Sequence, residues 1–172
     1  MKYQPIFEDE FIHAQIKWHK PVPLIDNWGE FSDWNKYDHN NIYFYKFIAI
    51  RENTPSPIIN LIYIGFSTRP IYKRLQDKDH LAKQQKAKKE NPGFRFYVCA
   101  GELLNPSAKN VKHVKDYETL LIYSHKNTNF RKLMNVSNAL KHNITKSIII
   151  ENSGYLKDGM YKKVSYGLFH YV

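Results

Sequence analysis

Residues 41–75 read NIYFYKFIAIRENTPSPIINLIYIGFSTRPIYKRL, two apolar runs joined by a polar segment that carries two prolines. Residues 42–50 and 58–65 are rich in aromatic and β-branched side chains, which favour strands. Residues 51–57 have the composition of a turn. The stretch therefore predicts a β-hairpin with a longish loop. Its second strand ends in Tyr63-Ile64-Gly65, where we expect Gly65 to let the chain turn sharply into a basic segment.

Beyond the hairpin, predicted helices and strands interleave. Apolar spacing predicts a helix over residues 70–89, with Pro70 in its first turn and Ser67 or Thr68 as its cap. Its apolar stripe comprises Ile71, Leu75 and Ala82. The remaining elements are expected as a strand over 94–100, a helix over 111–125, a strand over 147–152 and a last strand over 160–169. This order predicts an α+β fold with a small mixed or antiparallel sheet flanked by helices.

The length of 172 residues suits one domain with its own core. Within this single domain, 1–172, we expect a core over 41–140, a wrapping N-terminal arm over 1–40 and a C-terminal β extension over 141–172. The single cysteine, Cys99, is expected to be buried and inert. No signal peptide and no run of transmembrane length is recognisable, which predicts a cytoplasmic protein with no membrane partner.

The net charge of +10 favours a polyanionic partner, first nucleic acid and second an anionic membrane surface. A basic protein with neither partner is the alternative. Charge concentrates around the helix over 70–89, where nine bases and three acids leave +6. Such a cluster either binds phosphates through counterion release or is a solvated helix face. The bases are Arg69, Lys73, Arg74, Lys78, Lys83, Lys86, Lys88, Lys89 and Arg95, and the acids are Asp77, Asp79 and Glu90.

Glu118 interrupts an apolar stripe. On a helix over 111–125 it shares one face with Val114, Leu121 and His125. An inward carboxylate is costly unless it is paired or binds a cation. Glu118 is therefore either a boundary residue that reaches solvent or an arginine, or a metal ligand aimed into a cleft.

The order of these features resembles the GIY-YIG nuclease family over about residues 40–140. The first motif is read as Asn41-Ile42-Tyr43, with Asn in place of the usual Gly, and the second as Tyr63-Ile64-Gly65. The family's arginine matches Arg74, nine residues after Gly65. Its glutamate matches Glu118, which is followed by Leu120 and Leu121.

The resemblance implies hydrolysis of DNA phosphodiesters with one divalent cation, Mg²⁺ or Mn²⁺, held by Glu118. Arg74 is expected at the scissile phosphate. Tyr43 and Tyr63, side by side on adjacent strands, would bind or deprotonate the attacking water, and Lys73, Arg74 and the metal would lower the pKa of a phenol. The sequence does not choose between the two tyrosines.

Besides Asn41, two further positions depart from the family pattern. The family often has a histidine one turn after its arginine, where this chain has Lys78. His80 lies six residues after Arg74, about 120° round an ideal helix, and would serve only if the helix is distorted. The family's asparagine has two candidates, Asn135 and Asn129.

The size of the chain is similar to that of small type II restriction endonucleases, which implies a sequence-specific homodimer that cuts double-stranded DNA. The alternatives are a GIY-YIG nuclease of repair or structure-specific type, and a non-catalytic nucleic-acid-binding module. DNA contacts are expected from the arm over 1–40, the predicted hairpin over 154–163, and Arg69, Lys78, Lys83, Lys86, Lys88 and Lys89.

Overall fold

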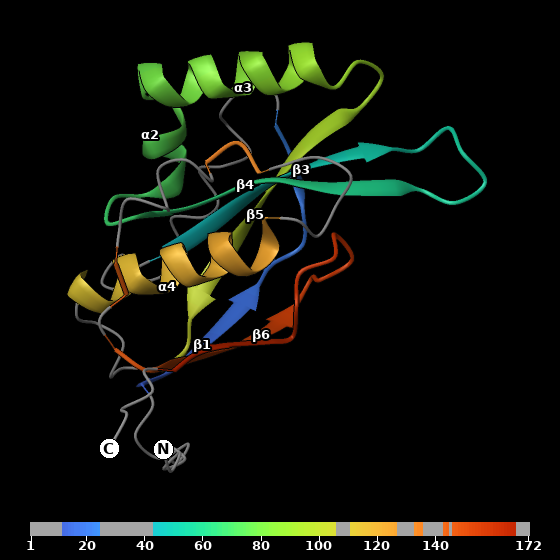
Figure 1. Ribbon diagram of the computed structural model, residues 1–172. Coiled ribbons are helices and arrows are strands. Elements are labelled where there is room, and N and C mark those ends of the chain that lie inside the picture. Colours follow the sequence, from blue (N-terminus) through green and yellow to red (C-terminus); the bar gives the residue numbers. More distant parts are fainter. Residues whose placement is uncertain are drawn as a thin grey trace.

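A computed structural model describes residues 12–24, 43–105, 111–126, 133–135, 143–144 and 146–167. These residues form an α+β fold, a mixed seven-stranded curled sheet with three helices (Figure 1). No helix in this part of the chain is long and apolar enough to cross a membrane. The elements are β1 (Ile12–Trp18), β2 (Val22–Pro23), β3 (Tyr43–Arg51), β4 (Ile58–Ser67), α2 (Ile71–Leu75), α3 (Lys78–Glu90), β5 (Arg95–Leu103), α4 (Val111–His125), β6 (Ile148–Gly154) and β7 (Lys163–Tyr166).

The strands lie in the order β4-β3-β5-β1-β6-β7, and β2 pairs with β5. The predicted hairpin is confirmed, since β3 and β4 pair antiparallel from Arg51↔Ile58 to Tyr43↔Ser67. β5 pairs with the other edge of β3. One pairing is parallel, that of β1 with β6, so the sheet is mixed. The predicted helix over 111–125 is also confirmed, with the same ends, as α4.

The expectation of a wrapping N-terminal arm is wrong for residues 12–18. These residues form β1, which lies inside the sheet between β5 and β6, with its even-numbered residues towards the core. The C-terminal strand β6 is equally integral. Trp18 donates its Nε1–H to Asn152 Oδ1 at 3.0 Å, and the backbone of Trp18 accepts the N–H of Tyr155 at 2.9 Å. Strands β1 and β6, far apart in the sequence, therefore complete the sheet.

The expected helix over 70–89 is two helices, α2 and α3, because Asp77 between them has an extended backbone. Ser67 does not cap it; its hydroxyl bonds to the backbone of Arg69. Ala82 is exposed, contrary to expectation. The break rotates α3 so that it buries His80, Gln84 and Ala87.

The two faces of the sheet carry separate cores. Alternate residues of β3 point to opposite sides, with Tyr45 and Phe47 in one core and Phe44 and Ile48 in the other. The core containing Tyr45 lies under α2 and α3, and Ile71, Leu75 and Ala87 belong to it. The other core includes the apolar side of α4 and the strands β1 and β6 (Figure 1).

Candidate active site

Two tyrosines meet where β3 and β4 pair, and they are Tyr45 and Tyr63. Their rings are stacked, with centroids 6.0 Å apart and an interplanar angle of 24°. In the register of the hairpin Tyr45 pairs with Gly65 and Tyr63 with Phe47. Tyr43 pairs with Ser67, so the prediction that Tyr43 and Tyr63 are side by side is wrong. The tyrosine beside Tyr63 is Tyr45, two residues after Tyr43.

Gly65 makes room for this pair of rings. A Cβ atom at Gly65 would lie 2.7 Å from Cζ and Oη of Tyr45 and 2.8 Å from Cε1 of Tyr63. Gly65 is not among the glycines with positive φ, so the sharp turn expected of it does not occur. The glycine is required because the Tyr45 ring lies across its backbone, where no side chain would fit.

His80 completes the group on the α3 side. Its side chain is fully buried, and Nε2 lies 3.0 Å from the Tyr45 hydroxyl. The ring presents its edge to Tyr63, with centroids 5.8 Å apart and an angle of 88°. The break before α3 is the distortion that the sequence required for His80 to reach the site, while Lys78 is exposed.

The protonation of this group follows from its burial. Burial first, and then the charges of Arg74 and Lys83, lower the pKa of His80 to about 4, so the imidazole is neutral at pH 7. Burial also raises the pKa of both phenols, to about 12 for Tyr63 and far higher for Tyr45.

The two phenols are not equivalent. Their mutual hydrogen bond raises the pKa of Tyr45 and lowers that of Tyr63. The Tyr45 hydroxyl is also in hydrogen-bond contact with Nε2 of His80. Nδ1 of His80 has no hydrogen-bond partner in the described part of the chain.

Arg74 is held beside the phenols by two carboxylates. Its guanidinium lies 2.5 Å from Oδ2 of Asp77 and 3.3 Å from Oδ2 of Asp79. Burial raises the pKa of both phenols, and the Arg74 charge opposes that effect. Lys73, expected to share this role, is exposed, and its ammonium lies 5.9 Å from the centre of the Tyr72 ring.

Glu118 shares one stripe of α4 with Val114, Leu121 and His125, as the sequence predicted; these three side chains are buried and Glu118 is half-buried. Burial raises the pKa of the Glu118 carboxyl to about 7. A hydrogen bond from the Phe66 backbone and the charges of Lys115, Lys83 and Arg74 lower that pKa, but they do not offset burial. The carboxylate is therefore short of positive charge.

Asn135 closes the outer side of β4. Its Nδ2 donates to the backbone oxygen of Ile64, and the preceding residue, Met134, donates its N–H to Ile62 at 3.0 Å. The side chain is buried, and Oδ1 has no partner among the described residues. The other candidate, Asn129, lies outside the described residues.

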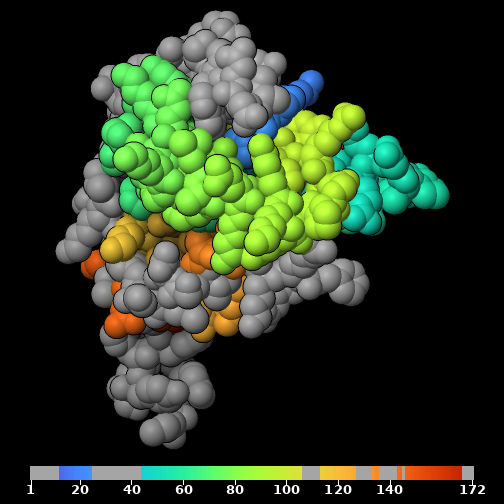
Figure 2. Space-filling model, turned by 90° about the horizontal axis from the view of Figure 1, so that it is seen from above, coloured from blue at the N-terminus to red at the C-terminus, as the bar shows by residue number. Residues whose placement is uncertain are grey.

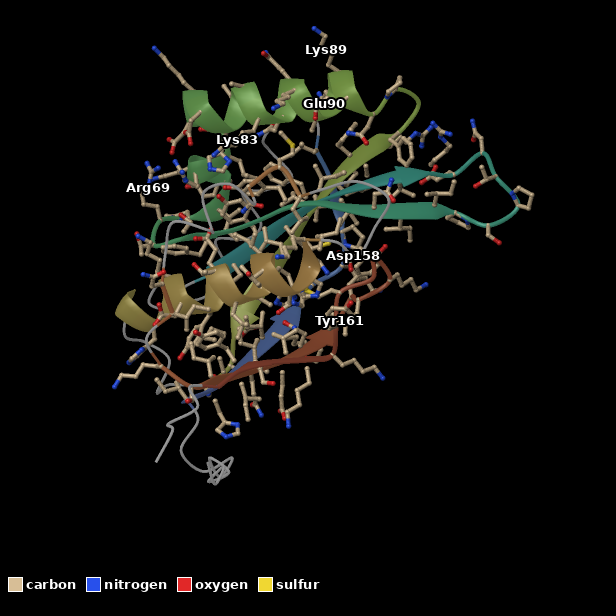
Figure 3. The ribbon with its side chains drawn as sticks, viewed as in Figure 1. Arg69, Lys83, Lys89, Glu90, Asp158 and Tyr161 are labelled. Atoms are coloured by element: carbon tan, nitrogen blue, oxygen red, sulfur yellow. The ribbon has the colours of Figure 1, made fainter. Side chains whose placement is uncertain are left out.

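The predicted phosphate-binding cations lie over α2 and α3, which form one outer surface of the molecule (Figure 2). Lys83 is the nearest to the site, with its ammonium 5.2 Å from the centre of the Tyr63 ring, and Lys89 points away from the sheet (Figure 3). Arg69 pairs with Asp77, and Lys86 with Glu90 at 3.7 Å. The exposed members of the set are Arg69, Lys78, Lys86, Lys88 and Lys89.

This donor set can hold a magnesium ion only through a single carboxylate, that of Glu118, with water as the remaining ligands. Among the described residues, no three His, Cys, Asp or Glu side chains are grouped to hold a metal. Mg²⁺, however, commonly binds through one or two carboxylates and keeps several waters. Glu118 offers a desolvated carboxylate whose raised pKa a divalent cation would lower.

Motif matching missed Tyr45, although a signal for it was present. A hairpin with its loop centred near residues 54–55 brings Phe44 and Tyr45 opposite Gly65, and the register shift between Phe47 and Ile48 makes Tyr45 the partner. Comparisons of the chain with protein-family models, with curated proteins and with solved structures gave no match.

Proposed function

We propose that the protein is a DNA endonuclease that hydrolyses phosphodiester bonds with one divalent cation. The observation that carries the proposal is the hydrogen-bonded group of Tyr45, Tyr63 and His80 beside Arg74 and Glu118. It is the set implied by the likeness to GIY-YIG nucleases, with Tyr45 in the role first given to Tyr43. A buried phenol pair, a cation and an uncompensated carboxylate suit attack of water on a phosphate.

Tyr63 is the better candidate for the base that takes a proton from the attacking water. Its pKa is the lower of the two phenols, and the hydrogen bond with Tyr45 lowers it. A Tyr45 O–H that donates to the Tyr63 oxygen would stabilise the phenolate, and His80, which is neutral, would orient Tyr45 through the contact of its Nε2 with the Tyr45 hydroxyl. The phenol pKa of about 12 still has to fall for this role, and the positive charge of Arg74 acts in that direction.

Arg74 and Glu118 have separate tasks. The guanidinium would bind the scissile phosphate and stabilise its developing charge, in exchange for its contacts with Asp77 and Asp79. Glu118 would hold Mg²⁺ or Mn²⁺, which supplies further neutralisation of the phosphate and of the leaving oxygen. Asn135 positions β4 by its bond to Ile64.

The substrate class follows from charge. A net charge of +10 and the exposed cations of α2 and α3 favour a polyanion that runs past the site. We propose double-stranded DNA as the substrate, read in a sequence-specific manner, with two copies of the chain cutting the two strands as in a type II restriction endonuclease.

The test is a digest of several sequenced plasmids with Mg²⁺, comparing the wild type with Glu118→Gln. The wild type is expected to give discrete fragments whose mapped ends share one short sequence, and Glu118→Gln is expected to bind DNA without cutting it. Glu151→Gln removes one exposed carboxylate from β6 and serves as the matched control.

Other results would change the proposal in defined ways. Cleavage of branched but not linear DNA would favour a repair or structure-specific nuclease. DNA binding without any cleavage, unaffected by Mg²⁺ and by Glu118→Gln, would replace the enzyme with a nucleic-acid-binding module.

A further inference from the structure

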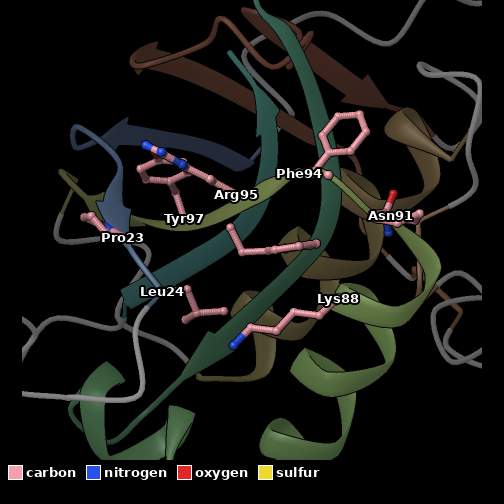
Figure 4. Close-up of a pocket in the computed structure, with 10 residues that line it drawn as sticks. Pro23, Leu24, Lys88, Asn91, Phe94, Arg95 and Tyr97 are labelled. Atoms are coloured by element: carbon pink, nitrogen blue, oxygen red, sulfur yellow. The ribbon is translucent and has the colours of Figure 1, made fainter. Parts of the chain in front are cut away.

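A pocket of about 570 Å³ lies at the end of α3 that is away from His80. The last turn of α3, the turn at Pro92 and Gly93, the first residues of β5, and Pro23 and Leu24 form its walls (Figure 4). Its volume is in the usual range for small-ligand sites, about 300–1,000 Å³. None of the roles assigned above uses this pocket.

Aromatic rings line the pocket, and contacts outside it hold two of them in place. The guanidinium of Arg51 lies 4.5 Å from the centre of the Phe94 ring and donates to the backbone oxygen of Pro92 at 3.1 Å. The Tyr97 hydroxyl donates to Oε1 of Glu52 at 3.1 Å. Preset rings can stack on a planar ligand without a large loss of side-chain entropy.

The charge of the pocket favours an anionic ligand. Lys88 and Arg95 line it, and none of its lining residues, all of which are described, is acidic. The Arg95 side chain is 77% exposed, and its pair with Glu52, at 3.2 Å, is a surface ion pair that contributes little. A planar ring joined to a phosphate is the ligand that combines both features, and a nucleotide has this composition.

The position of the pocket relates it to the candidate site. Eight residues of α3 separate His80 from Lys88, about 12 Å of helix, or roughly four steps of a DNA strand. The exposed cations Lys78, Lys86 and Lys89 lie on the same helix. A strand whose phosphate is at Arg74 and which follows α3 would reach the pocket, and a concave pocket admits a base only when that base is unpaired.

We propose that this pocket holds one unpaired nucleotide of the DNA strand bound at the candidate active site, with its base on Phe94 and Tyr97 and its phosphate at Lys88 and Arg95. The inference rests on the proposed function for its ligand. The protein would therefore bind DNA in which a base a few steps from the cut is extruded or single-stranded.

The first test measures binding without cleavage. In a chelator, fluorescence anisotropy compares a blunt duplex with the same duplex carrying a four-nucleotide thymidine tail. Phe94→Leu removes the ring but keeps apolar volume beneath Arg51, and it is expected to weaken binding of the tailed probe about tenfold while changing the blunt probe less than about twofold. Lys86→Gln, on the same helix outside the pocket, is expected to weaken both probes equally.

Equal losses on the two probes with Phe94→Leu, or no loss, would overturn the inference. Arg95→Gln provides a second variant that does not disturb the core, since the Arg95 side chain is exposed. This variant should also weaken binding of the tailed probe more than binding of the blunt probe. Iodouracil in the tail, which couples to aromatic rings on irradiation, should be found on residues 94–97; coupling only to other residues would contradict the placement.

These measurements separate the two proposals. Selective loss of the tailed probe would stand even if no plasmid were cut, because no cleavage is involved. Conversely, a protein that cuts plasmids but binds both probes alike would keep the proposed function and lose the pocket.

Discussion

Tyr45 and Lys46 are neighbours in β3 whose side chains enter opposite cores, and their surroundings differ in one respect. The Lys46 ammonium is fully buried and fully partnered. It lies 3.1 and 2.9 Å from the two carboxylate oxygens of Asp158, 2.8 Å from the backbone oxygen of Tyr155 and 4.7 Å from the centre of the Trp18 ring. This cluster joins β3 to the loop between β6 and β7.

The Tyr45 side is buried to a similar degree but differs in how its carboxylate is balanced. Buried atoms that lack a hydrogen bond do not separate the two sides, because His80 Nδ1 and Asn135 Oδ1 share that property with Asp158 Oδ2 among the described residues. The Asp158 carboxylate lies 2.9 Å from the Lys46 ammonium, whereas burial raises the pKa of the Glu118 carboxyl despite the charges of Lys115, Lys83 and Arg74. The difference teaches that a buried carboxylate paired with a cation and one left without a close cation should respond differently to substitution and to added metal.

The largest expected effect is on the Lys46 side. Asp158→Leu leaves a buried ammonium without its carboxylate and is expected to lower the free energy of unfolding by about 3–5 kcal/mol. Lys46→Met combined with Asp158→Leu should recover most of that loss. Urea denaturation of the three proteins checks this, and a single variant that costs under about 1 kcal/mol would show that the two sides are not different in kind.

On the Tyr45 side, Glu118→Gln is expected to raise the free energy of unfolding rather than lower it. Because burial raises the pKa of Glu118 from 4.5 to about 7, the folded wild type holds a proton that the unfolded chain releases, and stability falls as pH rises through this range. The variant should be more stable than the wild type by about 3 kcal/mol at pH 8 and equally stable at pH 4. The difference between the two proteins cancels the opposite contribution of His80, whose lowered pKa makes stability rise between about pH 4 and 6.5.

Added Mg²⁺ should reduce the difference in stability between the wild type and Glu118→Gln at pH 8. At a hundred times its dissociation constant, an ion that binds only the folded state stabilises it by about 2.7 kcal/mol. Thermal unfolding at pH 8 should show this gain for the wild type and not for Glu118→Gln, whereas Asp158→Leu should keep it. A gain that is the same in Glu118→Gln would place the ion elsewhere.

The smallest expected change in stability comes from a comparison of the Tyr45 and Tyr155 hydroxyls. Tyr45→Phe removes the donor to Tyr63 and should slow cleavage about tenfold to a hundredfold, with a loss of stability of only about 1 kcal/mol. Tyr155→Phe, on the Lys46 side, keeps the backbone oxygen that Lys46 uses and should leave the rate unchanged. Single-turnover rates on a plasmid provide the measurement, and equal rates for the two variants would remove Tyr45 from the proposed chemistry.

The sequence predicted those features that local periodicity encodes. The hairpin and α4 follow from strand and helix periods, and Glu118 stood out because it broke an apolar stripe. Tyr45 was missed because a motif is matched by spacing along the chain, whereas its neighbour is set by the register across the hairpin. The break before α3 depends on tertiary contacts, since Gln84 donates to the last carbonyl of α2, Leu75 O, at 3.1 Å and His80 bonds to Tyr45.

β1 is a different case, because its signal was visible. Ile12, Ala14, Ile16 and Trp18 alternate with polar residues, the period of a half-buried strand. This alternation was overlooked because the residues that follow it are rich in proline and tryptophan. Most lysines of α3 are exposed, but the sequence could not show that Lys83 lies over the Tyr63 ring.

The parallel pairing of β1 with β6 has a consequence for how the protein is made. It joins strands far apart in the sequence, and Trp18 and Asn152 are 134 positions apart. On the ribosome β1 is therefore made long before its parallel partner β6. Contacts this distant in sequence form slowly, so hydrophobic strands stay exposed until their partners are available. The middle of the sheet therefore closes last, and a chain stopped short of β6 leaves Trp18 without a core to enter.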